Sequence, residues 1–296
     1  MSAENMIPRS NQWGDQPELV SLWKRVFGDP EQYIRCFQRY SGNPGDAVLL
    51  EEKGRIVSAI YVIPLDGVWL PDGQKHSISL TYALATAPEF RGKGYGKKVM
   101  NTAIWRSFAD GVEYSALWPA EDSLFPHYKA VSDYVDAFTV REAVVPKPKV
   151  PIDTAGIRSA QAGEYDAFRN DFLMEHCNFF LSMGEKVIAF QKEVCHMIGG
   201  GCFLLGEKEP WGCAVCERDS ESCVAVKELL CPEDKTEEAI RQIAAVLPAK
   251  EYIVRTPAFL GESLGGEVRR CGQMQCRSGS TDFLKNGPGY YGLAFD

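Results

Sequence analysis

The stretch from Leu80 to Phe108 constrains the fold of this chain more than any other. It opens with a continuous apolar run that stops at Pro88, passes through a charged loop rich in glycine, and then resumes apolar residues at helical spacing. These three parts predict a strand, a loop and a helix, in that order.

The loop, residues 91–96, reads RGKGYG. Glycine has no Cβ, so three glycines at alternate positions let backbone N–H groups converge on a ligand. A helix N-terminus leaves N–H donors without partners and carries a partial positive charge, so the loop is suited to a phosphate or diphosphate. The glycine spacing fits neither the dinucleotide fingerprint G-x-G-x-x-G nor the P-loop.

The stretch resembles motif A of the GNAT acetyltransferase superfamily, R/Q-x-x-G-x-G/A. Arg91, Gly94 and Gly96 stand in the motif positions, and residues 87–90, APEF, precede the arginine as in that family. The alternative is that the loop is an ordinary glycine-rich turn. The resemblance implies acetyl-CoA as the donor and acetyl transfer to an amine.

Patterns along residues 5–145 agree with this fold. They predict helices at 17–27 and 30–40, strands at 47–50 and 56–63 with a turn at Lys53-Gly54, a strand at 112–117, a helix at 122–131 and a strand at 134–140. The order of elements is that of the GNAT fold.

The second half repeats this order more weakly. Helices are expected at 164–173, 185–198 and 234–247, and strands at 156–158, 202–205, 211–216, 223–230 and 252–255. The fold class is therefore α/β (α+β): two tandem GNAT folds with mixed central sheets flanked by helices. The expected domains are 1–145 and 156–296, joined by a proline-rich linker at 146–155.

The second copy is expected to be degenerate. Where the glycine loop would stand, it reads CPEDKTEEAIRQI, residues 231–243, with several carboxylates that would repel a diphosphate. The layout loosely resembles the enhanced-intracellular-survival type of acetyltransferase. We expect no C-terminal sterol-carrier-like domain, because 296 residues leave no room for one.

The resemblance also implies where the donor binds. In the family the pantetheine arm adds alongside the strand that precedes the loop, where a backbone N–H polarises the thioester carbonyl. The residues expected to hold the cofactor are Leu84, Ala85, Thr86, Arg91, Gly92, Lys93, Gly94, Tyr95, Gly96, Lys97 and Ser123.

Catalytic roles are expected at three residues. Tyr128 stands near the family's F-Y-x-x-x-G-F signature, whose tyrosine protonates the departing thiolate, although His127 departs from the pattern and the alternative is a core tyrosine. Glu121, with its neighbour Asp122, could bind the amine or relay its proton through water, or could simply cap a helix. Asp296, through its carboxylates, is a candidate base by analogy with the enhanced-intracellular-survival type, in an apolar tail, residues 289–296, that is expected to pack as a final strand.

Composition excludes some classes of protein. Hydrophobic residues make up 45% of the chain, which is typical of a globular protein, and we expect a cytoplasmic location because no export signal or membrane-length apolar run is present. The net charge is -8, and residues 151–296 carry 15 Lys and Arg against 22 Asp and Glu. This argues against nucleic acid and favours a cationic small molecule or basic peptide, unless the acidic surface only confers solubility. No metal site is expected, since Cys213 and Cys216 lie three apart on an apparent strand and face opposite sides.

The sequence therefore predicts an N-acetyltransferase that moves acetyl from acetyl-CoA to a primary amine of a small cationic molecule or a basic side chain. Its partner would be the small-molecule amine, with oligomerisation possible and no membrane or nucleic acid involved. Two alternatives remain: an acyl or aminoacyl transferase with another donor, and a sensor that binds acyl-CoA without turnover.

Overall fold

The structure is a computed structural model that describes residues 6–149 and 156–293. The chain forms two compact units: unit 1 is Met1–Leu65, His76–Asp136 and Gln273–Thr281, and unit 2 is Asp66–Lys75, Ala137–Gly272 and Asp282–Asp296. Three strands contain residues of both units: β5 (Lys75–His76), β8 (Val135–Pro146) and β15 (Glu267–Cys276). The division at 145 and 156 stays a prediction, and residues 150–155 of the expected linker lie outside the described residues.

Unit 1 begins with two helices and continues with a mixed sheet. Its other elements are β1 (Arg9–Ser10), α1 (Gln16–Phe27), α2 (Glu31–Ser41), β2 (Ala47–Glu52), β3 (Arg55–Pro64), β6 (Ile78–Thr86), α3 (Tyr95–Ala109), β7 (Tyr114–Leu117) and α4 (Leu124–Ser132). Gly28 ends α1 in a left-handed conformation, with its N–H bonded to the Lys24 carbonyl at 3.0 Å. Lys53 and Gly54 both have positive φ, which closes the predicted hairpin between β2 and β3.

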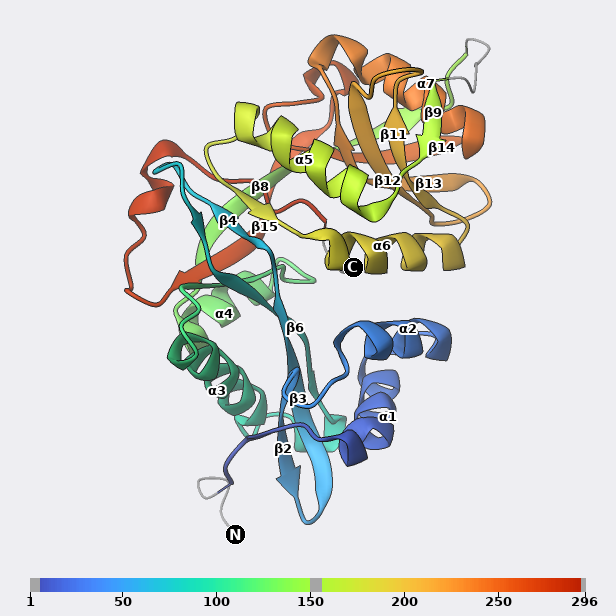
Figure 1. The fold of residues 1–296 in the computed structure, drawn as a ribbon. Coiled ribbons are helices and arrows are strands. Elements are labelled where there is room, and N and C mark those ends of the chain that lie inside the picture. The colour runs from blue at the N-terminus through green and yellow to red at the C-terminus, as the bar shows by residue number, and fades with distance from the viewer. Residues whose placement is uncertain (1–5, 150–155, 294–296) are drawn as a thin grey trace. The chain divides into compact units, whose positions relative to one another are not determined.

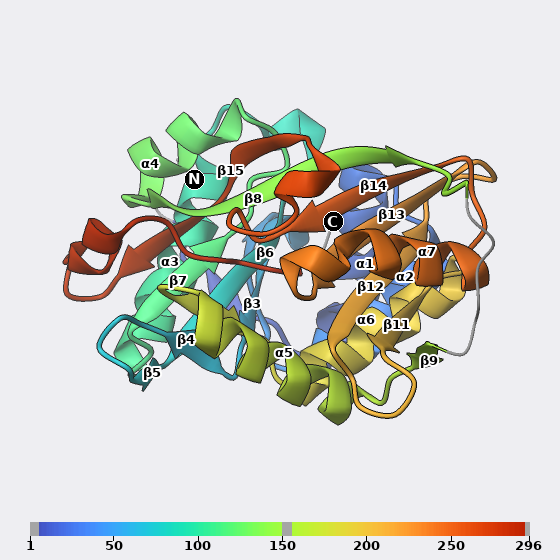
Figure 2. The same cartoon turned by 90° about the horizontal axis from the view of Figure 1, so that it is seen from above.

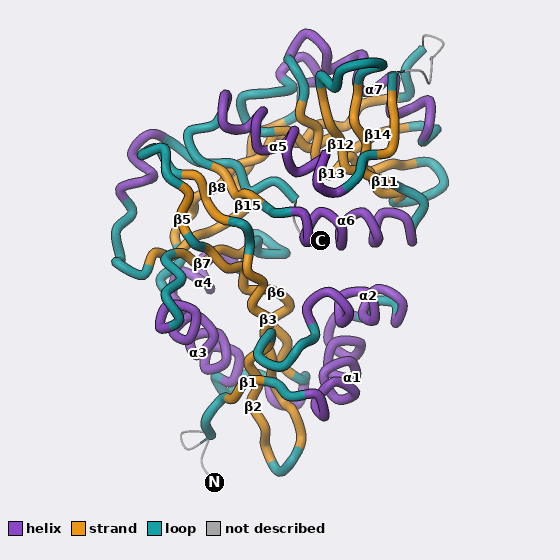
Figure 3. The backbone as a smooth tube through the Cα atoms, viewed as in Figure 1, coloured by secondary structure: helices purple, strands orange, loops and turns teal. Residues whose placement is uncertain are grey.

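The strand order in unit 1 is β1-β2-β3-β6-β7-β15. Only β6 and β7 pair in parallel, and every other neighbouring pair named in this order is antiparallel in the described residues. Helices α1 and α3 cover opposite faces of the sheet (Figures 1 and 3). Each face therefore has its own apolar core, one under α3 around Val99 and Met100, the other under α1 around Leu19 and Leu22.

Unit 2 has a similar composition of elements. They are β4 (Gly67–Trp69), β9 (Ile157–Ser159), α5 (Ala162–His176), β10 (Phe180–Ser182), α6 (Glu185–Met197), β11 (Gly201–Leu205), β12 (Gly212–Arg218), β13 (Cys223–Leu230), α7 (Thr236–Val246) and β14 (Glu251–Thr256). The strand order is β8-β14-β13-β12-β11-β9, and Figure 2 shows β8, β14 and β13 side by side. A separate sheet of three strands has the order β10-β4-β5.

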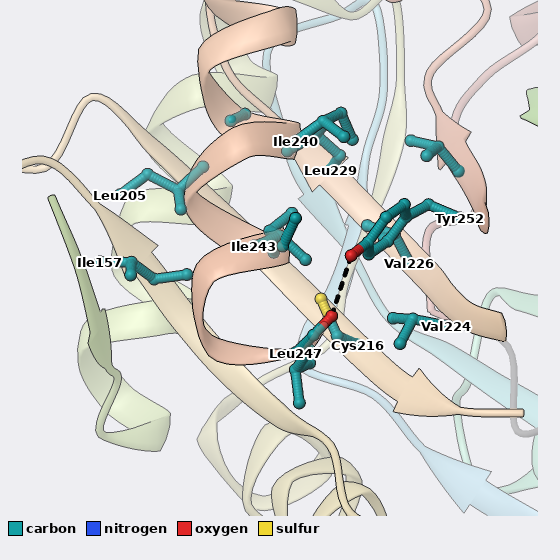
Figure 4. Close-up of a cluster of buried hydrophobic side chains, with 14 of the residues drawn as sticks. Ile157, Leu205, Cys216, Val224, Val226, Leu229, Ile240, Ile243, Leu247 and Tyr252 are labelled. Atoms are coloured by element: carbon teal, nitrogen blue, oxygen red, sulfur yellow. Dashed lines mark hydrogen bonds between the residues drawn. The ribbon is translucent and has the colours of Figure 1, made fainter. Parts of the chain in front are cut away.

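The core of unit 2 lies between α7 and the sheet (Figure 4). Ile240 and Ile243 of α7 pack against alternate residues of β13, including Val224 and Val226. The Tyr252 hydroxyl donates to the Leu247 carbonyl at 3.0 Å, so this buried phenol is satisfied at the end of the helix.

The expected mixed α/β class is confirmed, but four strands were missed, namely β4, β5, β10 and β15. Strands β4 and β10 are each three residues long, and they pair although more than a hundred residues separate them in the sequence. The polar sequence of β15 shows no alternation, yet residues 273–276 pair with β7. The described part of the tail is buried as expected, but it pairs only through bridges at Gly289 and Tyr290.

Candidate active site

Strand β6 is interrupted by a β-bulge. Tyr82 pairs with Tyr61 and Ala85 pairs with Ala59, so two residues of β6 stand opposite a single residue of β3. Ala83, inside the bulge, has φ of 51°, a left-handed conformation that is unusual for alanine. The bulge therefore changes the direction of the β6 backbone between the two halves of the strand.

The pairing of β6 with β7 ends at the same level. The last parallel pair is Leu80 with Ala116, whereas β6 continues to Thr86. Backbone polar groups beyond this point, on the β7 side of β6, face no partner strand in the described residues, and such groups need hydrogen bonds. Leu84 and Ala85 place their side chains in the cores on the two faces. We therefore expect their backbone, rather than their side chains, to meet a ligand.

The glycine loop lies between β6 and α3. After a 3-10 turn, η3 (Pro88–Phe90), Gly92 and Gly94 have φ of 76° and 77°, and Gly94 caps α3 without a side-chain hydrogen bond. The Lys98 N–H is bonded to the Gly94 carbonyl at 3.1 Å, so the N–H groups of residues 95–97 form the open end of the helix. A Cβ on Gly96 would lie 3.3 Å from the Thr86 hydroxyl, so glycine allows the helix to approach β6 closely.

The side chains around this loop differ in what they can offer. Tyr95 is 4% exposed and donates to Glu52 at 2.9 Å, so only its backbone faces the loop. Arg91 is exposed, with its Nε 3.3 Å from the Thr86 carbonyl, and Lys93 lies over the Phe90 ring at 4.7 Å. An open pocket of about 530 Å³ extends along α3 from the loop, lined by Lys93, Gly94, Lys97, Lys98, Asn101, Thr102 and Trp105.

Helix α4 carries the candidate acid. Burial raises the pKa of Tyr128 above its ordinary value, so the phenol keeps its proton at neutral pH. Ser123, the residue before α4, donates its hydroxyl to Glu121 at 3.2 Å, and both are exposed. Asp296 lies outside the described residues.

Two residues that the sequence did not single out also belong to this region. Tyr134 is fully buried, and its hydroxyl lies 2.7 Å from the Ser115 hydroxyl and 3.2 Å from that of Thr81. Burial raises the pKa of Tyr134 to about 12, although these hydrogen bonds lower it.

Gln273, on β15, is the second such residue. It is fully buried and donates to the Asp136 carboxylate at 2.7 Å and to the Phe125 carbonyl of α4 at 3.2 Å. No local pattern indicated this role, because the contact joins positions 137 and 148 residues apart.

Within residues 6–149 and 156–293, no group of three or more His, Cys, Asp or Glu side chains could hold a metal ion. None of the helices described in these ranges has both the length and the apolar character needed to cross a bilayer. The features that stand out are thus an interrupted strand, an open helix end and a buried phenol.

Comparison with known proteins relates the segment that carries these features to a protein family. A family model described as an acetyltransferase (GNAT) domain matches residues 8–130. No match was found among curated protein sequences.

Solved structures share the fold across most of the chain. A GCN5-related N-acetyltransferase from Kribbella flavida is 17% identical with a TM-score of 0.65, covering 93% of this chain and 72% of its own. One from Anabaena variabilis ATCC 29413 is 11% identical with a TM-score of 0.67, covering 92% and 73%. Eis1 from Mycobacterium abscessus is 11% identical with a TM-score of 0.60, covering 91% and 73%. Residues 8–130 therefore match the GNAT acetyltransferase family, which supports an acyltransferase, and the chain shares the fold of the solved GCN5-related N-acetyltransferases.

Proposed function

We propose that this acyltransferase moves an acetyl group from acetyl-CoA to a primary amine of a small cationic molecule or a basic side chain. The observation that carries the proposal is the β6 strand, which loses its β7 partner after Leu80, bulges at Ala83 and runs into the glycine loop. An extended donor arm needs an unpaired strand edge, and its phosphates need an open helix end.

The residues of the loop fit the phosphorylated part of coenzyme A. The N–H groups at the start of α3 can donate to the diphosphate, and Lys93, Lys97 and Lys98 supply positive charge along the adjoining pocket. Trp105 is 68% exposed and offers a ring face to an adenine base. When bound, acetyl-CoA supplies an activated acyl group as its thioester.

Three parts of the site would act on the reacting groups. A backbone N–H of the β6 bulge is suited to donate to the thioester carbonyl oxygen. Tyr128, which keeps its proton at neutral pH, is suited to protonate the sulfur of the leaving thiolate. Glu121 is an exposed carboxylate that can accept the proton of the attacking amine through water. The role of Asp296 stays a prediction, which truncation of the last two residues would test.

The acidic balance of the chain supports a cationic acceptor, because net negative charge attracts amines before they lose their proton. The test is the release of CoA thiol from acetyl-CoA across a panel of polyamines, aminoglycosides, arylalkylamines and lysine peptides. Acetylated product that depends on both donor and amine is the expected result. Binding of acetyl-CoA without CoA release from any amine would contradict turnover and favour the sensor. Tighter binding and faster transfer of a long-chain acyl-CoA would instead favour another donor.

A further inference from the structure

Tyr134 lies where strands β6 and β7 separate. Its hydroxyl contacts Thr81 on β6 at 3.2 Å and Ser115 on β7 at 2.7 Å. The last backbone pair between the strands joins Leu80 to Ala116, so Thr81 is the first β6 residue beyond the paired segment. One phenol therefore bridges the two strands at the point where their ladder ends.

The bridge is isolated from water, which makes it strong and specific. Tyr134 and Ser115 are fully buried, and Thr81 is 8% exposed. Removing the phenol oxygen would leave two buried hydroxyls without the partner they share, and unsatisfied buried groups are destabilising. The network thus holds the strands at one separation rather than over a range.

The position of Tyr134 is itself held from both sides. Asp133 ends α4 in a left-handed conformation, with φ of 56°, and its N–H bonds to the Lys129 carbonyl at 3.2 Å. Two residues after Tyr134, the Asp136 carboxylate accepts the buried amide of Gln273 at 2.7 Å. The phenol is therefore aimed by fixed backbone on either side of it.

We propose that Tyr134 is a positioning residue that sets the gap between β6 and β7 for the donor arm. This inference rests on the proposed function, because the gap matters only if the pantetheine arm enters it. A gap of fixed width is organised before the ligand arrives, which lowers the entropy lost on binding. Tyr134 acts without touching the acetyl group or the acceptor.

The test compares two ligands in Tyr134→Phe. Acetyl-CoA carries the pantetheine arm, whereas adenosine 3′,5′-bisphosphate carries only groups that the loop would bind. The Kd of acetyl-CoA should rise about tenfold, and that of the bisphosphate should stay unchanged. Tyr61→Phe is the matched control, since it removes another buried hydroxyl of unit 1, bonded to Gln38 at 2.6 Å, and should leave both affinities unchanged.

A second variant separates positioning from stability. Tyr134→Phe with Ser115→Ala and Thr81→Val removes the orphaned hydroxyls, so the melting temperature should recover while the acetyl-CoA affinity stays low. Amide exchange in the ligand-free protein should be faster across residues 81–86 in Tyr134→Phe than in Tyr61→Phe.

Three results would overturn the inference: equal weakening of both ligands, recovery of affinity together with stability, or unchanged amide exchange. Failure of the wild type to bind acetyl-CoA would instead refute the proposed function, and the role assigned to Tyr134 would fall with it.

Discussion

The segments that lead into α3 in unit 1 and α7 in unit 2 are similar as far as the 3-10 turn and differ after it. Each follows a central strand and a short turn with Pro-Glu, η3 (Pro88–Phe90) in one case and η4 (Glu233–Lys235) in the other. In unit 1 residues 91–94 then intervene before the helix, whereas in unit 2 the helix begins at once with Thr236. The inserted glycine loop is the backbone feature that distinguishes the two helix starts, and we propose that the loop, rather than a helix N-terminus alone, makes the anion site.

Charge sharpens the contrast. The first turn of α7 contains Glu237 and Glu238, while the first turn of α3 has no acidic residue. Glu233 also occupies the region in front of α7, where its carboxylate accepts the N–H groups of Gly261 at 2.6 Å and Ser263 at 3.0 Å. These donors belong to the turn at residues 261–263, so the Glu233 carboxylate ties that turn to the region in front of α7 and adds negative charge there.

The interrupted strand is common to both units, but its use differs. In unit 2 the register between β12 and β13 shifts around Lys227, one residue before Glu228. Glu228 and Arg169 are fully buried and lie 3.1 Å apart, and the Tyr165 hydroxyl donates to Glu228 at 2.8 Å. A Cβ on Gly292 would clash with Arg169, so the C-terminal tail closes over this pair. Beside its interrupted strand unit 2 thus holds a buried ion pair, whereas we propose that unit 1 binds a ligand beside its own.

Breaking that ion pair should give the largest effect. Arg169→Met leaves the Glu228 carboxylate buried and uncompensated, and should lower the free energy of unfolding by about 3–5 kcal/mol. Urea denaturation measures this, and Arg169→Met with Glu228→Leu should recover much of the loss. The folded protein should still bind acetyl-CoA. Stability unchanged in the single variant would show that the pair is not structural.

Removing the phenol of Tyr128 should give the next largest effect, confined to catalysis. Tyr128→Phe should lower kcat by about 100-fold or more, because a general acid contributes roughly that factor. The matched control from unit 2 is Tyr252→Phe, which should leave kcat unchanged, because the Tyr252 hydroxyl bonds to the Leu247 carbonyl and the Ala249 N–H just after α7.

The pH dependence of kcat follows from the same residue. An acid must be protonated to act, and burial raises the pKa of Tyr128, so the wild type should stay active up to pH values above an ordinary tyrosine pKa. The alkaline loss of activity should disappear in Tyr128→Phe. A similar kcat and pH profile in both proteins would reject Tyr128 as the acid.

Glu233 should contribute a smaller, pH-dependent amount of stability. Partial burial raises the pKa of Glu233, but the N–H groups of Ser263 and Gly261 outweigh this and lower it below its ordinary value. A lowered folded-state pKa gives stability that is present above the unfolded pKa of about 4.3 and is lost as the pH falls through the folded pKa. Glu233→Gln should therefore cost under about 1 kcal/mol at pH 7, since solvent screens this exposed group, and less below pH 4. A loss that persisted at low pH would point to a cause other than charge.

Reversing the acidic charge of α7 should have the smallest effect. Glu237→Lys with Glu238→Lys should not create a second acetyl-CoA site, because the glycine loop would still be missing. The measurement is the stoichiometry of acetyl-CoA binding, which should stay at one per chain. A second site would show that charge, rather than the loop, distinguishes the two units.

The sequence predicted those features that depend on local patterns. Gly92 and Gly94 indicated the loop, the apolar spacing of Val99 and Met100 indicated α3, and the carboxylates before α7 indicated a helix start unsuited to phosphates. These features depend only on residues that are close in the sequence, so apolar periodicity and turn residues are enough to predict them.

Long-range contacts could not be predicted in the same way. The bulge at Ala83 arises from register with β3, and the bond from Gln273 to the Phe125 carbonyl joins residues 148 positions apart. Tyr134 was not singled out, because only the fold brings Thr81 and Ser115 to its hydroxyl. Such roles follow from tertiary packing, which leaves no periodic trace in one sequence.

Calorimetric titration of acetyl-CoA tests the central claim most directly. The wild type should bind one molecule per chain with a Kd in the micromolar range, about -8 kcal/mol, and Arg91→Glu with Gly94→Asp should abolish binding while the protein stays folded, with a modest fall in melting temperature because Gly94 has φ of 77°. The Glu237→Lys, Glu238→Lys protein should bind as the wild type does. Undiminished binding by the loop variant, or none by the wild type, would contradict the account that unit 1 alone holds the donor at the start of α3.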